Sequence, residues 1–133
     1  MRWGTIAVLA ALAATGAAAQ APPSGDTGGG IVRAEKPMTG EQVYHQVCQA
    51  CHMADAKGAT GAATIPALAA NPRLGVAAYP VTIVAKGKGA MPGFTGMLSN
   101  AQMAEVITFL RTHYGNDFPK PVTEADVARI TGP

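Results

Sequence analysis

The sequence predicts an all-α protein built from short helices. Two segments open with a capping box, in which a Thr or Ser and a Gln three residues later exchange hydrogen bonds at a helix start; they begin at Thr39 and Ser99. Apolar residues recur at helical spacing after each box. A third segment, residues 80–86, starts with Pro and is followed by Gly87, as is typical of a short helix.

The first 19 of the 133 residues predict a secretory signal peptide. Arg2 supplies a positive start, an apolar run follows, and Ala17-Ala18-Ala19 is typical of a cleavage site after Ala19. The apolar run is shorter than the roughly 20 residues that a membrane helix needs. No later segment is long and apolar enough to cross a membrane, so we expect a mature chain without a membrane span, exported most simply to a bacterial periplasm.

Composition narrows the functional classes. Ten Lys and Arg stand against eight Asp and Glu, without a basic run, so nucleic-acid binding is not expected. Beyond the signal peptide the aromatic residues are three Tyr and three Phe, few for a core of this size. Another large apolar group is therefore expected to fill part of the interior.

The remainder of the chain divides into three parts. Residues 20–37 are rich in Pro and Gly and predict a flexible linker. Residues 38–116 predict one folded domain. Residues 117–133 form a C-terminal extension, in which residues 123–129 are expected to make a short helix.

Within the domain, a helix is expected to follow Thr39. Residues 58–64 predict a loop, and residues 66–70 a helical turn closed by Asn71-Pro72. The β-branched run of residues 80–86 would suit a strand, but Pro80 and Gly87 favour a short helix. Residues 87–98 predict an irregular loop rich in Gly.

The helix that begins after Ser99 is the clearest predicted element. Its apolar stripe consists of Met103, Val106, Ile107, Leu110 and Tyr114. Polar residues are expected on the opposite, outward face: Glu105, Thr108, Arg111 and Thr112. Gly115 and Pro119 are expected to end the helix.

The chemistry is concentrated at residues 48–52, whose sequence matches the C-x-x-C-H signature of c-type haem attachment. Positions i, i+3 and i+4 of a helix share a face, so Cys48, Cys51 and His52 point the same way. Two thioether bonds can then hold one edge of a porphyrin while the imidazole reaches the iron. We expect one covalent haem c, with His52 as an iron ligand.

Three other interpretations of the cysteine pair are weaker. A thioredoxin-like dithiol is expected in a βαβ setting, whereas a linker and a helix surround this pair. A disulfide across two residues closes a loop too small to add much stability. Zinc needs four convergent ligands, and His45, Cys48, Cys51 and His52 all lie on one short helix.

Met91 is the preferred ligand for the other face of the iron. Residues 89–93 predict a loop in which Pro92 favours an extended backbone at Met91, and the glycines let the main chain approach a flat ligand. Met97, or an open or His-ligated iron, is the alternative. The other candidates lie beside the motif, before the first helix or on the last helix: His45, Met53, Met38, Met103 and His113.

With these motifs, residues 39–115 resemble the class I monohaem cytochromes c. The resemblance rests on the attachment motif, the Met-Pro loop about forty residues later and the amphipathic last helix. It implies a cytochrome c fold with three to five short helices around a covalently attached haem. It also implies that the N- and C-terminal helices pack together, with Val43 and Val47 facing Ile107 and Leu110.

Residues 71–74, 88–94 and 112–116 are also similar to one group, the small bacterial cytochromes that take electrons from dehydrogenases. In the wider family a Pro carbonyl after the motif accepts a hydrogen bond from the ligand imidazole, which implies Pro66 as the partner of His52. Many members bind a haem propionate through Trp, which the mature chain lacks. Arg73 and Tyr79 are the implied substitutes.

An iron with both axial positions filled has no site for a substrate, so we expect an electron carrier and not an enzyme. The expected partners are a dehydrogenase donor and a cytochrome or oxidase acceptor. The alternatives are a fixed electron-transfer subunit of a dehydrogenase complex, a thiol–disulfide oxidoreductase that uses the cysteine pair, and a gas-binding or peroxidatic haem protein.

A largely uncharged docking face is expected near the exposed edge of the haem. Its candidate residues are Ala54 and residues 91–94, with Lys57, Lys86 and Lys88 at the rim. Because the net charge is small, electrostatic steering of partners is expected to be modest.

Overall fold

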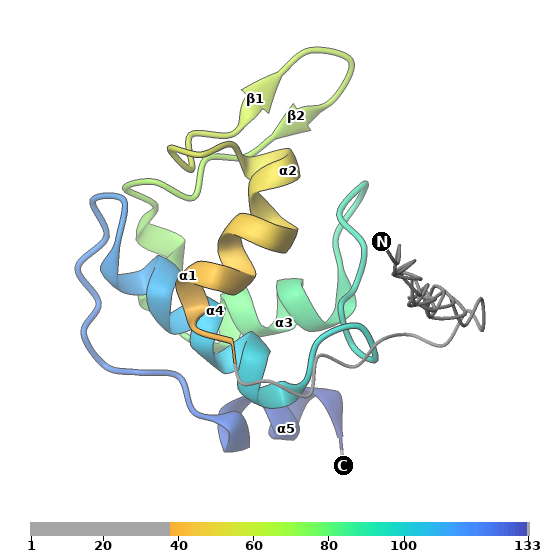
Figure 1. Ribbon diagram of the computed structural model, residues 1–133, viewed down its shortest axis with the longest axis vertical. Coiled ribbons are helices and arrows are strands. Elements are labelled where there is room, and N and C mark those ends of the chain that lie inside the picture. Colours follow the sequence, from red (N-terminus) through yellow and green to blue (C-terminus); the bar gives the residue numbers. More distant parts are fainter. Residues whose placement is uncertain (1–37, 133) are drawn as a thin grey trace, which may run out of the picture. The chain divides into compact units, whose positions relative to one another are not determined.

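The computed structural model describes residues 38–132 and confirms the predicted fold class, a mainly helical fold (Figure 1). The predicted signal peptide, residues 1–19, and the predicted linker, residues 20–37, lie outside the described residues. In chain order the elements are α1 Gly40–Val43, the π-helical turn η1 Tyr44–Cys48, α2 Gln49–His52, β1 Ala59–Thr60, β2 Thr64–Ile65, the 3-10 helix η2 Pro72–Gly75, α3 Ala78–Lys86, α4 Asn100–Thr112 and α5 Glu124–Thr131. Between residues 38 and 132 no helix is long and apolar enough to span a membrane.

One continuous helix, made of α1, η1 and α2, starts at the predicted capping box. The Thr39 backbone N–H donates to Oε1 of Gln42 at 3.0 Å, and the Gln42 N–H donates to Oγ1 of Thr39 at 3.2 Å. In η1 the Gln49 N–H bonds to the Tyr44 carbonyl, five residues back, so this turn is wider than an α-helical turn. The wide turn leads directly into the residues of the C-x-x-C-H motif.

The first helix packs across α4, and Gly40 makes the close approach possible. A Cβ atom at Gly40 would lie 2.2 Å from the Glu105 carbonyl oxygen and 2.7 Å from Cβ of Phe109. Val43 and Ile107 are fully buried in the core that this crossing creates. The predicted packing of the two helices against each other is confirmed.

The ambiguous segment 80–86 is helical, so the strand alternative is wrong. The helix α3 begins at Ala78, two residues before Pro80, which lies in the first turn where a missing N–H breaks no helical hydrogen bond. Val81 and Ala85 are buried in the core. This burial offsets the weaker helix propensity of the β-branched residues.

The segment between the motif and α3 differs from its prediction in two places. Residues 58–64 are not a plain loop, because they include most of the antiparallel pair β1–β2, in which Ala59 lies opposite Ile65. Residues 66–70 form no helical turn; the helical residues begin at Pro72, after Asn71. The Asn71 side chain accepts the Arg73 N–H and so caps η2 instead of ending an earlier helix.

The end of α4 also differs from its prediction. The helix stops at Thr112, and Tyr114, predicted on its apolar stripe, lies beyond the helix with φ at 56°. The predicted C-terminal helix is present and longer than expected, because α5 runs to Thr131 from a capping box at Thr123. Capping by Thr123 and the side chain of Asp126 explains where this helix starts.

The outward face predicted for α4 is partly covered by the C-terminal segment. Arg111, predicted to face solvent, is only 4% exposed, and its guanidinium donates to the carbonyls of Leu74, Gly75 and Lys120. Oγ1 of Thr108 exchanges hydrogen bonds with the backbone of Val122. Val122 and Val127 are buried in the same core as α4. Periodicity missed this because the covering chain comes from outside the helix.

The substitution Gly40→Ala tests the crossing of α1 and α4. We expect it to lower the free energy of unfolding by about 2 kcal/mol, because the new methyl group has no room beside the Glu105 carbonyl. Gly61→Ala is the matched control, since a Cβ there meets no atom within 4 Å. Urea unfolding of the purified full chain, followed by circular dichroism, measures both values. Equal losses for the two variants would contradict the packing argument.

Candidate functional site

The three residues of the C-x-x-C-H motif lie where η1 passes into α2. Cys48 is half-buried, Cys51 is exposed, and His52 is 7% exposed. Burial, together with the nearby Cys51, raises the pKa of the Cys48 thiol to about 11. Both cysteines carry free thiols. The helix thus brings together two thiols of different accessibility and one inward-facing imidazole.

The His52 ring is oriented by a single backbone contact. Its Nδ1 lies 3.1 Å from the carbonyl oxygen of Pro66. A carbonyl oxygen can only accept, so Nδ1 carries the proton and the neutral ring keeps a lone pair on Nε2. Burial lowers the pKa of His52, against the opposing effect of the Pro66 contact, and so favours this neutral form. Among the described residues Nε2 has no hydrogen-bond partner, which leaves it free to bind a metal.

The hairpin β1–β2 brings Pro66 back to the motif. The Gly58 N–H donates to the His52 carbonyl at 3.2 Å, at the point where the chain leaves the motif. Gly58 has φ at 69°, and a Cβ atom there would lie 2.1 Å from the Ile65 carbonyl oxygen. Only glycine fits this close return, which carries the chain directly to Pro66.

Met91 lies in a tightly closed loop after α3. Its backbone N–H and carbonyl both bond to Lys88, at 3.1 and 2.9 Å, across a turn with Gly89 at φ 61°. A Cβ atom at Gly87 would lie 2.5 Å from the Met91 carbonyl oxygen, so this glycine permits the close return. The Phe94 N–H bonds to the Val84 carbonyl of α3. The half-buried Met91 side chain therefore extends from a main chain held in place on both sides.

The structure separates the other sulfur and imidazole candidates by burial. Met97 is 59% exposed on a second turn of the same loop, whereas Met103 is 1% exposed in the core. His45 is exposed beside Gln49 and Glu41. His113 is exposed and stacks on the Phe109 ring, with 4.1 Å between ring centroids. The remaining two candidates are the half-buried Met38 and Met53, which is 39% exposed.

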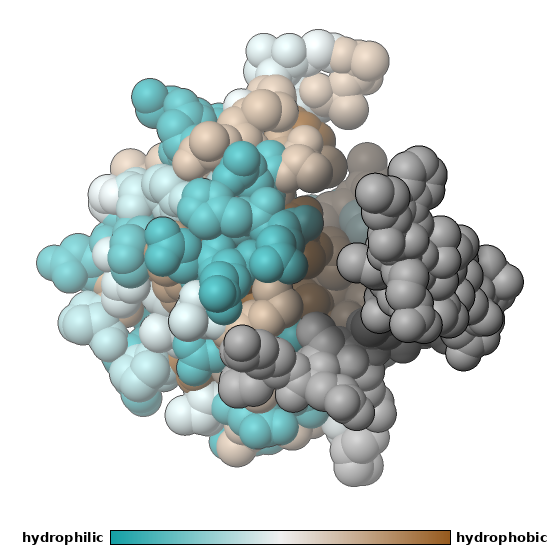
Figure 2. Space-filling view, viewed as in Figure 1, coloured by the Kyte–Doolittle hydropathy of each residue, from teal (hydrophilic) through white to brown (hydrophobic). Residues whose placement is uncertain are grey.

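The side of the molecule beside the motif carries hydrophobic residues. Figure 2 shows them gathered in a recess beyond the polar side chains of the first helices. In Figure 1 this is the side on which the loop of residues 87–98 lies opposite α2. Between residues 38 and 132 no three His, Cys, Asp or Glu side chains cluster to hold a bare metal ion, so the zinc interpretation gains no support.

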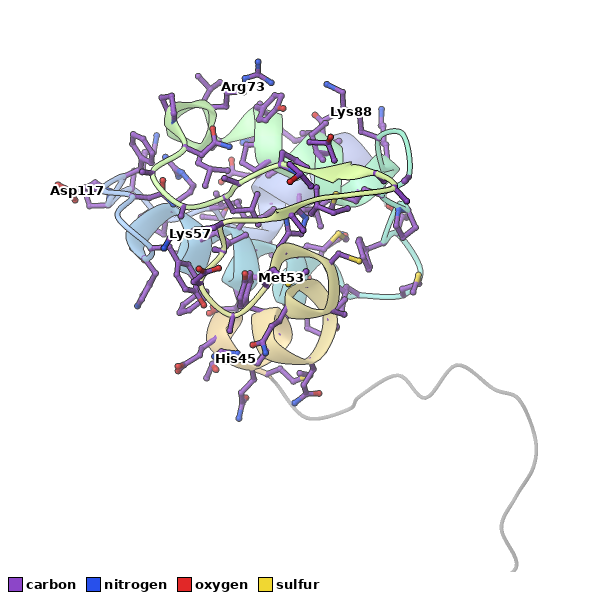
Figure 3. The ribbon with its side chains drawn as sticks, turned by 90° about the horizontal axis from the view of Figure 1, so that it is seen from above. His45, Met53, Lys57, Arg73, Lys88 and Asp117 are labelled. Carbon is purple, nitrogen blue, oxygen red and sulfur yellow. The ribbon has the colours of Figure 1, made fainter. Side chains whose placement is uncertain are left out.

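Arg73 and Tyr79 meet at the surface. Nη1 of Arg73 donates to the Tyr79 hydroxyl at 3.4 Å, and the guanidinium lies 5.9 Å from the centre of the ring. The hydrogen bond from Arg73 and the charges of Lys88 and Arg73 lower the pKa of Tyr79. Figure 3 shows Arg73 and Lys88 on the same edge of the molecule. This edge presents a cationic surface suited to a carboxylate.

Ala54 is exposed, and so are the three lysines predicted at the rim, Lys57, Lys86 and Lys88. Lys57 pairs with Asp55 at 3.5 Å, and in Figure 3 it lies away from the edge that carries Arg73 and Lys88. The positive charges of the predicted rim therefore do not form one continuous patch, because Lys57 lies apart from Lys88.

Tyr44 is a further residue of the site, which the spacing of apolar residues does not identify. It is fully buried, and its hydroxyl donates to the Met53 carbonyl at 2.6 Å. Met53 directly follows the motif with φ at 66° and ψ at 165°, a conformation that residues other than glycine rarely adopt. Burial and the nearby Tyr114 raise the pKa of Tyr44 to about 12, so the hydroxyl stays a donor. Helical spacing places Tyr44 on the apolar face but cannot reveal a contact with a carbonyl nine residues away.

The donor set fits covalent haem better than a bare metal ion. Two thiols lie within one turn of an imidazole whose Nδ1 is occupied and whose Nε2 is free. A family model described as cytochrome c oxidase, cbb3-type, subunit III matches residues 35–110. The chain therefore belongs to this family of cytochrome c domains, whose members bind haem c and transfer electrons.

Individual relatives agree with this class. The chain is 35% identical over 104 residues to the cytochrome c subunit of the quinone alcohol dehydrogenase of Gluconobacter oxydans, which is 68% of this chain and 21% of that subunit. It is 33% identical over 114 residues to the gluconate 2-dehydrogenase cytochrome c subunit of Pantoea cypripedii, or 74% of this chain and 25% of that subunit. It is 40% identical over 73 residues to cytochrome c6 of Leptolyngbya boryana, or 53% of this chain and 85% of that protein. The chain thus spans about a fifth to a quarter of the length of the dehydrogenase subunits that it matches.

The substitution Tyr44→Phe tests the contact that holds the end of the motif helix. We expect the free energy of unfolding to fall by about 1 kcal/mol, because the Met53 carbonyl loses a buried donor but keeps the Ala56 N–H. Tyr79→Phe is the matched control: its hydroxyl contact is longer and at the surface, so we expect a change below about 0.5 kcal/mol. Urea titration of both variants measures the two free energies of unfolding. A larger loss for Tyr79→Phe than for Tyr44→Phe would refute the stabilising role of the Tyr44 hydroxyl.

Proposed function

We propose that this chain is a monohaem c-type cytochrome that carries single electrons in the periplasm. Cys48 and Cys51 would hold the haem covalently, and His52 and Met91 would bind its iron. The observation that carries this proposal is the contact of His52 Nδ1 with the Pro66 carbonyl, because it leaves Nε2 free beside two thiols. The chain has two cysteines, enough to attach one haem.

When bound, haem c supplies a one-electron Fe(III)/Fe(II) couple, and a Met ligand raises its potential relative to two nitrogen ligands. The residues of this chain hold the two proposed ligand side chains in fixed positions. Pro66 holds the His52 ring, and the bonds between Lys88 and Met91 hold the loop. Because neither segment needs to move, the chain contributes little reorganisation when an electron arrives or leaves.

Arg73 and Tyr79 are proposed to bind a haem propionate. Their mutual hydrogen bond and the nearby Lys88 create a cationic surface that a carboxylate would favour. The pair takes the part that Trp has in many class I members.

The first test is the cofactor itself. We expect the full chain, expressed with a cytochrome c maturation system, to carry one covalently bound haem, visible by mass spectrometry and pyridine haemochrome spectra. Met91→Ala should abolish the absorption band of the Met–iron bond and open the reduced iron to carbon monoxide. Met97→Ala, on the exposed turn of the same loop, is the matched control and should leave both properties unchanged.

Each rival function has its own result in that experiment. A protein without covalent haem, with Cys48 and Cys51 cycling between thiols and a disulfide, would favour an oxidoreductase. Tight carbon monoxide binding by the reduced wild type would favour a gas-binding or peroxidatic protein. An unchanged band after Met91→Ala would overturn Met91 as the ligand.

A mobile carrier is favoured over a fixed subunit by the surface. Fixed subunits bury broad apolar interfaces. Among the described residues the large exposed hydrophobic side chains are three: Met53, Val76 and Met97. The names of the dehydrogenase relatives favour the alternative, a subunit or domain of a dehydrogenase complex. In both cases the proposed donor is a dehydrogenase, and for the carrier the proposed acceptor is a cytochrome or oxidase.

Fractionation of the native cells separates these two roles. We expect the mature protein in the fluid released by osmotic shock, at the sedimentation coefficient of a monomer. Detergent-solubilised membranes, probed with the same antibody, serve as the comparison. Recovery of most of the protein from salt-washed membranes, together with a dehydrogenase, would refute the free carrier and establish the subunit role.

A further inference from the structure

Asn116 is a buried amide between the end of α4 and the segment that follows Pro66. It is 7% exposed. Its Nδ2 lies within hydrogen-bond distance of the carbonyls of Leu68, Leu110 and His113, at 2.9, 2.8 and 3.0 Å. Its Oδ1 accepts the Asn71 N–H at 2.8 Å. One side chain thus joins segments that lie 45 and 48 residues apart in the sequence.

A second amide continues this connection toward Pro66. Nδ2 of Asn71 donates to the Ala67 carbonyl at 2.8 Å. The Ala70 N–H donates to the Tyr114 carbonyl at 3.0 Å. Residues 68–71 are therefore tied to residues 114–116 by three hydrogen bonds, at Leu68, Ala70 and Asn71. The Asn71 side chain extends this connection within the segment to Ala67, one residue after Pro66.

The segment needs these ties because it has no regular structure of its own. It belongs to no helix or strand, and Pro66 and Ala67 are exposed to solvent. On the other side of the segment, the N–H groups of Leu68 and Ala69 both donate to the carbonyl of Ala56. Pro66 has no N–H, and its carbonyl is the atom that contacts His52. The position of that carbonyl thus depends on the hairpin that precedes Pro66 and on the hydrogen bonds of the residues that follow it.

We propose that Asn116 is a positioning residue for His52, and that it sets the length of the hydrogen bond between His52 Nδ1 and the Pro66 carbonyl. The proposal rests on the proposed function, in which His52 binds the haem iron. A firm Nδ1–H contact makes an imidazole a stronger donor to a metal and favours the oxidised state. The C-terminal end of the domain therefore adjusts the reduction potential without touching the haem ligands.

A general loss of stability must be separated from this role. Val127→Ala removes two methyl groups from a fully buried side chain in α5, a helix that packs on α3 and α4. It destabilises the same core without removing any hydrogen bond to residues 66–71. It is the matched control for Asn116→Ala.

The experiment uses the haem-bearing full chain. In the reduced, diamagnetic protein, NMR measures the rate at which the His52 Nδ1 proton exchanges with solvent, and voltammetry measures the reduction potential. We expect Asn116→Ala to raise the exchange rate about tenfold or more, as for the loss of a buried hydrogen bond, and to raise the potential. Asn71→Ala should change both values in the same direction, and Val127→Ala should change neither.

Two results would overturn the positioning role: wild-type exchange and potential in Asn116→Ala, or equal changes in Val127→Ala. If Asn116→Ala yields no folded protein, Asn71→Ala decides by the same two measurements. Failure of the proposed function is a separate result, because it would appear in the wild type as absent haem or an iron not bound by His52.

Discussion

The hydrogen bond between His52 Nδ1 and the Pro66 carbonyl is the contact on which the rest of this molecule depends. It determines which ring nitrogen carries the proton, so it determines which one is left to bind a metal. It also joins the motif helix to a segment with no secondary structure of its own. The hairpin β1–β2, with its close return at Gly58, connects the two partners along the chain.

The remaining elements hold these two partners from opposite sides. The motif helix is held by its crossing with α4 at Gly40 and by the Tyr44 hydroxyl at its end. The Pro66 segment is held by Asn71 and Asn116, which belongs to the chain just after α4. Both supports therefore meet at α4, and α5 covers its outer side. A buried amide and a buried hydroxyl are costly unless they are hydrogen-bonded. Here the Tyr44 hydroxyl donates to the Met53 carbonyl, and the Asn116 amide contacts backbone groups that include the Leu68 carbonyl and the Asn71 N–H.

The surface is consistent with brief encounters between redox partners. Arg73, Tyr79 and Lys88 gather at one edge, whereas Lys57 is occupied by Asp55. A small net charge and a divided rim produce weak steering, which suits partners that must separate after one electron has passed. Exposed apolar side chains are few among the described residues, so tight binding through a broad apolar interface gains no support.

The sequence by itself indicated where the two main helices start and which residues carry the proposed chemistry. Capping boxes placed the helix starts at Thr39 and Ser99, and the spacing of Cys48, Cys51 and His52 indicated haem. Helix starts and attachment motifs depend on residues within four positions of each other, so a linear sequence displays them. The tertiary structure alone decided the burial of Arg111, the hydrogen bond of Tyr44 to Met53 and the hydrogen bonds of the Asn116 side chain. In each case a side chain contacts backbone carbonyls that no helical or strand period relates to it. Because every residue has a carbonyl, only the fold decides which one the side chain meets.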